Sequence, residues 1–174
     1  MSIGKQYTES KAIFRILLIL LLIIINIGCD QVSKKIVRNN IAPYETISML
    51  NDHVTVTHAE NPGAFLSLGD SLPKAAKNIL FSLLPVAMLA FVLYYIITRH
   101  SMSRLTMVGL CFIIGGGIGN VFDRIVYGSV TDFLHIKFGV FQTGIFNLAD
   151  LSIVTGTIIL LINYFLRKKQ VETA

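Results

Sequence analysis

Four apolar segments divide this sequence and constrain what it can fold into. They cover residues 13–28, 79–98, 105–122 and 145–166, with lengths of 16, 20, 18 and 22 residues. A helix needs roughly 17 to 25 apolar residues to cross about 30 Å of hydrocarbon. Only 14% of the residues are charged, against about 25% in soluble domains. The sequence therefore predicts an α-helical membrane protein with four transmembrane helices in a single domain.

The orientation of the chain follows from its basic residues. Four spans place both termini on one side of the membrane. The terminal segments and loop 99–104 carry eight Lys and Arg residues, and the segments on the other side carry seven. Basic residues close to the ends of spans are typical of cytoplasmic flanks. We therefore expect cytoplasmic termini and two extracytoplasmic segments, at 29–78 and 123–144.

The extracytoplasmic segments carry strand patterns and one short helix pattern. Residues 53–58 and 134–138 alternate with period two, which is typical of half-exposed strands. Asn-Pro-Gly at 61–63 is a turn signal and leads into an apolar run at 64–68. Residues 31–38 fit a short helix lying on the membrane surface. The sequence predicts a small β-sheet outside the bilayer, beside a short surface helix.

The third span is rich in glycine, with Gly115, Gly116, Gly117 and Gly119 in succession. A phosphate-binding loop is excluded because G-x-G-x-x-G does not occur in the chain. Gly115 and Gly119 are four residues apart, so they present a groove that another helix can approach closely. This pattern predicts tight helix packing and leaves the polar residues after it unexplained.

Two carboxylates lie at the outer ends of spans. Asp123 follows the third span and Asp150 lies near the start of the fourth, with Asp30 at the same end of the first. Ionisable residues at membrane depth usually mark functional sites. If Asp123 and Asp150 approach each other, the pair tends to hold one proton. Such a pair can activate a water molecule and hydrogen-bond a substrate carbonyl, which fits peptide-bond hydrolysis.

Other functions fit the sequence less well. H-E-x-x-H and G-x-S-x-G do not occur, and the four histidines are scattered. A small membrane transporter or proton-conducting protein is the main alternative, since membrane acids also mark ion paths. Such a path needs polar residues through the bilayer, and the second span has no ionisable residue. A scaffold that binds partner helices through the glycine groove would leave Asp123 and Asp150 without a role.

Five short motifs in order connect the sequence to a known family. They are Asp30-Gln31 with Lys34, Asn61 with Gly63, Gly-Asn-Val-Phe-Asp-Arg at 119–124, Val-Thr-Asp-Phe at 130–133, and Phe-Asn-Leu-Ala-Asp at 146–150. With four spans, this pattern resembles the bacterial type II signal peptidases, or lipoprotein signal peptidases, over nearly the whole chain. The sequence departs from the family at two places. Gly117 stands where the family commonly has Ala, and the Gly-Ala-Phe stretch at 63–65 is a tighter turn sequence than the one that the family commonly has.

The resemblance implies an aspartic endopeptidase whose catalytic dyad is Asp123 and Asp150. The residues that would line or brace the site are Asp30, Lys34, Asn61, Gly63, Asn120, Arg124 and Asn147. The implied substrate is a diacylglyceryl-modified prolipoprotein, cut before its lipidated Cys at the extracytoplasmic face of the bacterial inner membrane. We expect membrane lipid around a monomer, and neither a cofactor, a metal nor a nucleic-acid partner.

The residues alone leave three roles open. Asn147 is also a candidate helix cap, because Asn is favoured at that position. Arg124 and Lys34 are also candidates for basic side chains that reach the membrane surface and fix helix depth. Asp132 is interpreted as a turn or strand-start residue, with a site-supporting role as the alternative.

Overall fold

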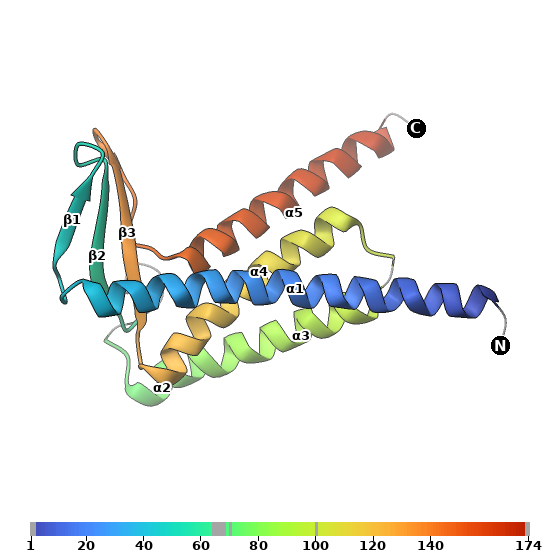
Figure 1. Cartoon of the computed structure of the whole chain (residues 1–174), viewed down its shortest axis with the longest axis horizontal. Helices are drawn as coiled ribbons and strands as arrows, with labels where there is room; N and C mark the ends of the chain where they lie inside the picture. Colours follow the sequence, from blue (N-terminus) through green and yellow to red (C-terminus); the bar gives the residue numbers. More distant parts are fainter. Residues whose placement is uncertain (1–2, 64–68, 70, 100, 173–174) are drawn as a thin grey trace.

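The computed structural model describes residues 3–63, 69, 71–99 and 101–172. A helical bundle carries a small sheet at one end, and both termini lie at the other end (Figure 1). The helices are α1 (Ile3–Asn40), α2 (Lys74–Asn78), α3 (Leu84–Thr98), α4 (Arg104–Val126) and α5 (Leu148–Glu172), with a π-helical turn, η2 (Ile79–Leu83), before α3. The strands are β1 (Thr46–Met49), β2 (Val54–Asn61), β3 (Val130–Phe138) and β4 (Phe141–Gln142).

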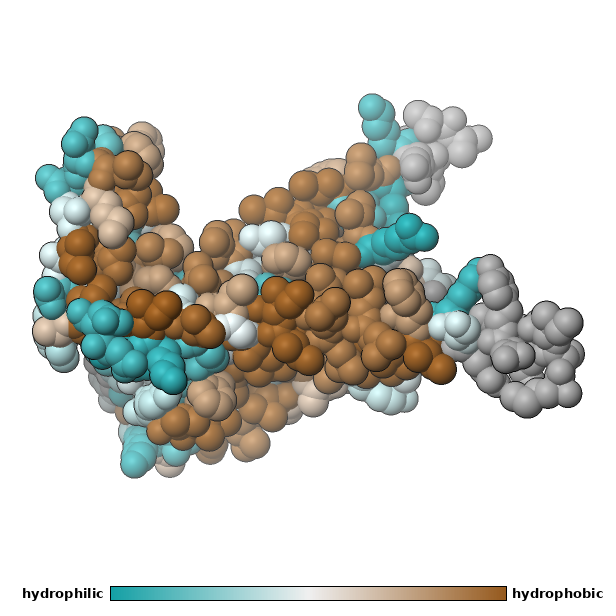
Figure 2. All heavy atoms as spheres, viewed as in Figure 1, coloured by the Kyte–Doolittle hydropathy of each residue, from teal (hydrophilic) through white to brown (hydrophobic). Residues whose placement is uncertain are grey.

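Four helical stretches are long and apolar enough to cross a membrane. They are Ser10–Asn40, Lys74–Thr98, Arg104–Val126 and Leu148–Lys169. Large apolar side chains on their surfaces are exposed, as Phe14, Phe91 and Phe165 illustrate, and Figure 2 shows this hydrophobic surface along the bundle. The four predicted spans are confirmed in number and order. The protein is a multi-pass membrane protein.

The first helix is longer than predicted. The expected span at 13–28 and the expected surface helix at 31–38 form one continuous helix, α1, which ends at Asn40. No proline lies within α1, and each of its two glycines, Gly4 and Gly28, costs only about 1 kcal/mol relative to alanine, so the helix continues to Asn40. The segment at 31–38 is therefore helical but not a separate element.

The central helix of the bundle is α4, which packs against α1, α3 and α5. Its glycines make this possible. A Cβ at Gly115 would meet Asn26 of α1, and a Cβ at Gly116 would meet the carbonyl oxygen of Ala149 on α5. The predicted glycine groove is thus confirmed as the place where neighbouring helices approach α4 closely.

The sheet is antiparallel with strand order β1-β2-β3-β4. The predicted strands at 53–58 and 134–138 pair with each other, with Val54 opposite Ile136. Both are longer than predicted, because β2 continues to Asn61 and β3 begins at Val130. The register shifts between Val56 and Ala59, which places Ala59 opposite Asp132.

Two apolar clusters hold the sheet and bundle together on either side of the polar site. One lies within the bundle and contains Ile19, Ile23, Ile96, Met107, Cys111 and Ile114. The other joins Val37 and Ile41 of α1 to Phe133 of β3.

The predicted turn at 61–63 is present, since the Asn61 Oδ1 atom accepts a hydrogen bond from the Gly63 amide. The predicted apolar run at 64–68 lies outside the described residues.

Candidate active site

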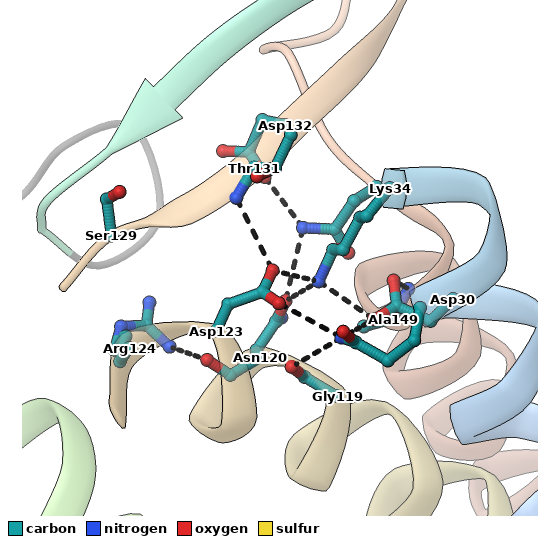
Figure 3. A network of polar contacts seen from close by, with 12 residues as sticks. Asp30, Lys34, Gly119, Asn120, Asp123, Arg124, Ser129, Thr131, Asp132 and Ala149 are labelled. Atoms are coloured by element: carbon teal, nitrogen blue, oxygen red, sulfur yellow. Dashed lines mark hydrogen bonds and ion pairs between the residues drawn. The ribbon is translucent and has the colours of Figure 1, made fainter. Parts of the chain in front are cut away.

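The predicted site residues come together where the outer ends of α1 and α4, the start of α5 and the first half of β3 meet (Figure 3). The helices supply most of the polar groups, and β3 adds one more acid. Asp30, Lys34, Asp123 and Asn147 are each 0% exposed, although all carry polar or charged side chains. Buried polar groups of this kind need partners, so their hydrogen bonds define the geometry of the site.

Lys34 lies at the centre of an ion-pair network. Its Nζ atom is 2.8 Å from the Asp30 Oδ2 atom and 2.9 Å from the Asp123 Oδ2 atom. It also donates a hydrogen bond of 3.0 Å to the Asn120 Oδ1 atom. An ammonium group has three donors, so all three are used. The alternative prediction, that the Lys34 side chain reaches the membrane surface, is wrong, because Lys34 is fully buried.

Asp123 is bonded through both of its carboxylate oxygens. Oδ2 contacts Lys34 and accepts from the Thr131 amide at 3.5 Å. Oδ1 accepts a hydrogen bond of 3.0 Å from the Gln31 side chain and lies 3.7 Å from Arg38. These partners come from α1 and β3, and Figure 3 shows Asp123 directed toward Lys34. Asp123 is therefore a buried counter-ion of Lys34.

Asp30 connects α1 to the first turn of α5. Its Oδ1 atom accepts a hydrogen bond of 2.9 Å from the Ala149 amide. The first amides of a helix have no partner within that helix, and a carboxylate satisfies one of them. A Cβ at Gly119 would contact the Asp30 Oδ2 atom. The glycine on α4 therefore makes room for this contact between α1 and α5.

Asp150 and Asn147 cap the start of α5 reciprocally. The Asn147 Oδ1 atom accepts from the Asp150 amide at 2.9 Å, and the Asp150 Oδ2 atom accepts from the Asn147 amide at 3.3 Å. This is the geometry of a capping box. The other carboxylate oxygen of Asp150 accepts a hydrogen bond of 2.7 Å from the Asn120 side chain. Asp150 remains partly exposed, unlike Asp123.

Asp132 is another buried acid, and it lies close to Asp150. Its carboxylate accepts a hydrogen bond of 2.6 Å from the Asn147 side chain and one of 3.0 Å from Asn61. Burial raises the pKa of Asp132 to about 6, and the negative charge of Asp150 adds to the increase. Asn147 thus contacts Asp132 with its side chain while it caps the helix that carries Asp150.

Asp123 and Asp132 are connected to Asp150 through different intervening side chains. Asp123 is linked to it through Lys34 and Asn120, since the Asn120 side chain accepts from Lys34 and donates to Asp150. Asp132 is linked to it through Asn147 alone. Of the two, Asp132 is the acid whose carboxylate has no cation as a hydrogen-bond partner within the described part of the chain.

Arg124 is hydrogen-bonded to the turn that follows β2. It donates a hydrogen bond of 3.0 Å to the Gly63 carbonyl and one of 3.4 Å to the Asn120 carbonyl. Its Nε atom is buried and has no hydrogen-bond partner. In Figure 3 it lies on the opposite side of Asp123 from Lys34. Arg124 therefore holds Asn61 and Gly63 near the acids rather than pairing with Asp123.

All nine predicted site residues lie in this one region, and sequence reasoning did not assign a site role to Gln31 and Thr131 or settle one for Asp132. A signal for Asp132 exists in the sequence: it is an acid within the apolar strand start Val-Thr-Asp-Phe. Within residues 3–63, 69, 71–99 and 101–172, no group of three or more His, Cys, Asp or Glu side chains is arranged to hold a metal ion.

Comparisons with known proteins agree on one family. The family model described as Signal peptidase (SPase) II matches residues 21–166. The lipoprotein signal peptidase of Clostridioides difficile (strain 630) is 38% identical over 150 residues, which cover 84% of this chain and 93% of that protein. The lipoprotein signal peptidase of Solibacter usitatus (strain Ellin6076) is 34% identical over 142 residues, or 81% of this chain and 86% of the other.

The fold also has a solved counterpart. A bacterial membrane enzyme determined at 2.3 Å resolution superposes with a TM-score of 0.77 over 87% of this chain and 90% of the other, at 23% sequence identity. At this level of identity the likeness concerns the fold, which is the arrangement of four membrane helices and an extramembrane sheet.

Proposed function

The chain belongs to the signal peptidase II family of membrane peptidases, and we propose that it removes signal peptides from diacylglyceryl-modified prolipoproteins, cutting before the lipidated Cys. The observation that carries this proposal is the pair of acids, Asp132 and Asp150, joined by Asn147 where α5 enters the bundle. A substrate anchored by acyl chains presents its cleavage site near the membrane surface, which is where these acids lie.

Asp132 is the partner of Asp150 in the mechanism that we propose. The pairing of Asp150 with Asp123 stays a prediction, and the contacts of Asp123 argue against it. Its oxygens are bonded to Lys34, Gln31 and the Thr131 amide, and the side chain is fully buried. A carboxylate whose two oxygens are both held by buried donors has little freedom to turn toward a water molecule or a substrate carbonyl.

The two acids divide the work of hydrolysis. Asp150 accepts two N–H hydrogen bonds in the first turn of α5 and is partly exposed, so a water molecule can reach its carboxyl group. It acts as the general base that takes a proton from the attacking water. Asp132, with its raised pKa, holds a proton and donates it to the carbonyl oxygen of the scissile peptide bond. The tetrahedral intermediate collapses when Asp150 passes the proton it took from water to the amine nitrogen of the lipidated Cys and Asp132 takes its proton back from a hydroxyl of the intermediate. The C–N bond then breaks, and the signal peptide leaves with a C-terminal carboxyl group.

Pockets beside Arg124 suit the lipid part of the substrate. One of about 370 Å³ is lined by polar Asn78, Ser82 and Arg124. It shares Val86 and Ile125 with an apolar groove of about 360 Å³ between α3 and α4. A surface that changes from polar to apolar toward the bilayer interior matches a glyceryl ester followed by an acyl chain.

The location of the enzyme follows from the same proposal. We place it in the bacterial cytoplasmic membrane, with the sheet and the acids at the extracytoplasmic face and both termini in the cytoplasm. The expectations of a monomer that needs neither cofactor, metal nor nucleic acid are part of this proposal and remain open to test.

Asparagine substitutions of the three acids test the assignment. Asp132→Asn and Asp150→Asn should each lower cleavage of a lipidated precursor peptide by roughly a thousandfold or more, as loss of an essential acid or base does. Asp123→Asn should lower cleavage less, because Lys34 keeps Asp30 as a partner. Asp52→Asn, at an exposed acid in the β1–β2 turn, is the matched control and should cleave normally.

The outcomes separate the possible dyads. Normal cleavage by Asp132→Asn, with Asp123→Asn as inactive as Asp150→Asn, would return Asp123 to the dyad. Normal cleavage by Asp150→Asn would reject an aspartic mechanism at this site. An unlipidated version of the same peptide, assayed in parallel, should be cleaved poorly if the diacylglyceryl group is recognised.

A further inference from the structure

The free end of the sheet carries an exposed apolar turn. Phe138, Val140 and Phe141 are 59%, 91% and 80% exposed, and we refer to these three residues as the apolar turn. The turn connects β3 to β4, which pair through Phe138 and Phe141. Exposed apolar groups clustered in this way usually mark an interaction surface.

The apolar turn belongs to the edge of the sheet that leads into the membrane. After β4, the chain runs back along β3, with the Thr143 amide bonded to the Ile136 carbonyl and the Phe146 amide to the Leu134 carbonyl. It then enters α5 at Leu148. Because β1 forms the opposite edge of the sheet, the apolar turn lies on the edge adjacent to the transmembrane helices.

The sheet projects sideways beyond the bundle. In Figure 1 its strands run across the axis of α1 and extend past α1 on the side of α5. Figure 2 shows the surface hollowed between the sheet and α5, with hydrophobic surface on the side of the sheet that faces α5. Leu151 and Val154, in the first two turns of α5, are exposed apolar side chains.

We propose that the apolar turn inserts into the outer interface of the lipid bilayer that the four helices span. The partner is membrane lipid, because the turn continues the lipid-facing surface of the bundle on the same side of the molecule. Removing Phe138, Val140 and Phe141 from water provides the driving force. The insertion gives the sheet a second attachment, at the end opposite the contact of Phe133 with Val37 and Ile41.

Tryptophan fluorescence tests this insertion directly, because the chain contains no Trp. We would compare Phe141→Trp with Tyr44→Trp, each in liposomes of phosphatidylcholine brominated on its acyl chains. Tyr44 is 84% exposed and precedes β1, at the edge far from α5, so it is the matched control. Neither position takes part in the proposed chemistry, so the result is independent of peptidase activity.

The apolar turn should place its Trp within reach of the bromine atoms. We expect Phe141→Trp to show blue-shifted emission and at least about threefold more quenching than Tyr44→Trp. Val140→Trp should behave like Phe141→Trp. Equal quenching at positions 141 and 44 would overturn the proposal. Blue-shifted emission without bromine quenching would also overturn it, since the turn would then be covered by protein, such as a second copy of the chain.

Discussion

The ammonium group of Lys34 ties together the charges of the site. It contacts Asp30 and Asp123 and fixes the amide of Asn120, whose other end bonds Asp150. Two carboxylates and one ammonium group carry a net charge of −1, and Arg38 lies 3.7 Å from Asp123. A buried network of this kind contributes orientation more than stability, because desolvation offsets the attraction.

Lys34→Met should destabilise the protein by about 3–5 kcal/mol, because it leaves two carboxylates buried without a cation. Adding Asp123→Asn to Lys34→Met should recover part of this loss, since the two residues are coupled. Thermal unfolding in detergent can be followed with a thiol-reactive dye in a Cys29→Ser background, because Cys111 is buried. An unchanged melting temperature for Lys34→Met would show that the network does not stabilise the fold.

As the proton donor that we propose, Asp132 should make cleavage depend on pH. Asp132 holds its proton below a pKa of about 6 and loses it above. With substrate-free enzyme as the reference, kcat/KM should fall by about tenfold per pH unit well above 6. Because the folded state binds this proton more tightly than the unfolded chain, the contribution to stability also decreases as pH rises from about 4 to 6.

A pH profile of kcat/KM from 4 to 8, measured with a lipidated peptide in micelles, checks this expectation. The exposed-acid variant Asp52→Asn serves as the control and should keep the profile of the unmodified protein. A profile that stays flat through pH 6 and 7 would mean that Asp132 does not need its proton for cleavage.

At the scale of elements, α4 determines how closely the other helices approach. A Cβ at Gly116 would collide with the backbone carbonyl of Ala149, the residue before Asp150. A Cβ at Gly117 would meet only the end of the Leu89 side chain. A backbone carbonyl cannot move aside as the end of a side chain can. Gly116 should therefore tolerate an added methyl group less well than Gly117 does.

Gly116→Ala should therefore cost about 1–3 kcal/mol of stability and lower cleavage, because α5 and Asp150 are displaced from α4. Gly117→Ala is the matched control and should leave both quantities close to normal. Melting temperature and initial cleavage rate, measured side by side, distinguish the two variants. Similar behaviour of both alanine variants would contradict the assigned α4–α5 contact.

At the scale of the whole molecule, the charged site separates two apolar regions. The cluster around Ile19, Ile96 and Met107 holds the bundle, and the cluster of Val37, Ile41 and Phe133 holds the sheet against α1. The acids come from three helices and a strand, so their geometry depends on how both regions are joined. Both ends of the chain lie away from the sheet (Figure 1).

The orientation in the membrane can be tested with single cysteines in a Cys29→Ser background. A cysteine at Glu45 should react with a membrane-impermeant maleimide from outside the cell. A cysteine at Ser101, in the loop between α3 and α4, should react only after the membrane is permeabilised. Labelling of the Ser101 position from outside would reverse the orientation and move the site to the cytoplasmic face. Cys111 is buried and is not expected to react.

The sequence by itself determined the four spans and the central pair of strands of this protein. Apolar length gave the four spans, period-two alternation gave the paired strands, and glycine spacing gave the close packing of α4. These are local properties, because a helix or strand of this kind shows its periodicity in neighbouring residues. The sequence also predicted that Asp30, Asp123 and Asp150 share one membrane level, because the ends of antiparallel spans meet there, and the family resemblance added the other six site residues.

Only the tertiary structure decided which polar groups are partners. From the sequence, Asp123 and Asp150 were equivalent acids at matched helix ends. In the fold, Asp123 faces Lys34, and Asp132 is brought to Asn147 by the strand register with its shift between Val56 and Ala59. The rotation of a helix about its axis and the register of a strand depend on packing between distant segments. A local sequence pattern does not contain that information, so the contacts of Asp150 follow only from the fold, and Asp132 as its catalytic partner is our proposal.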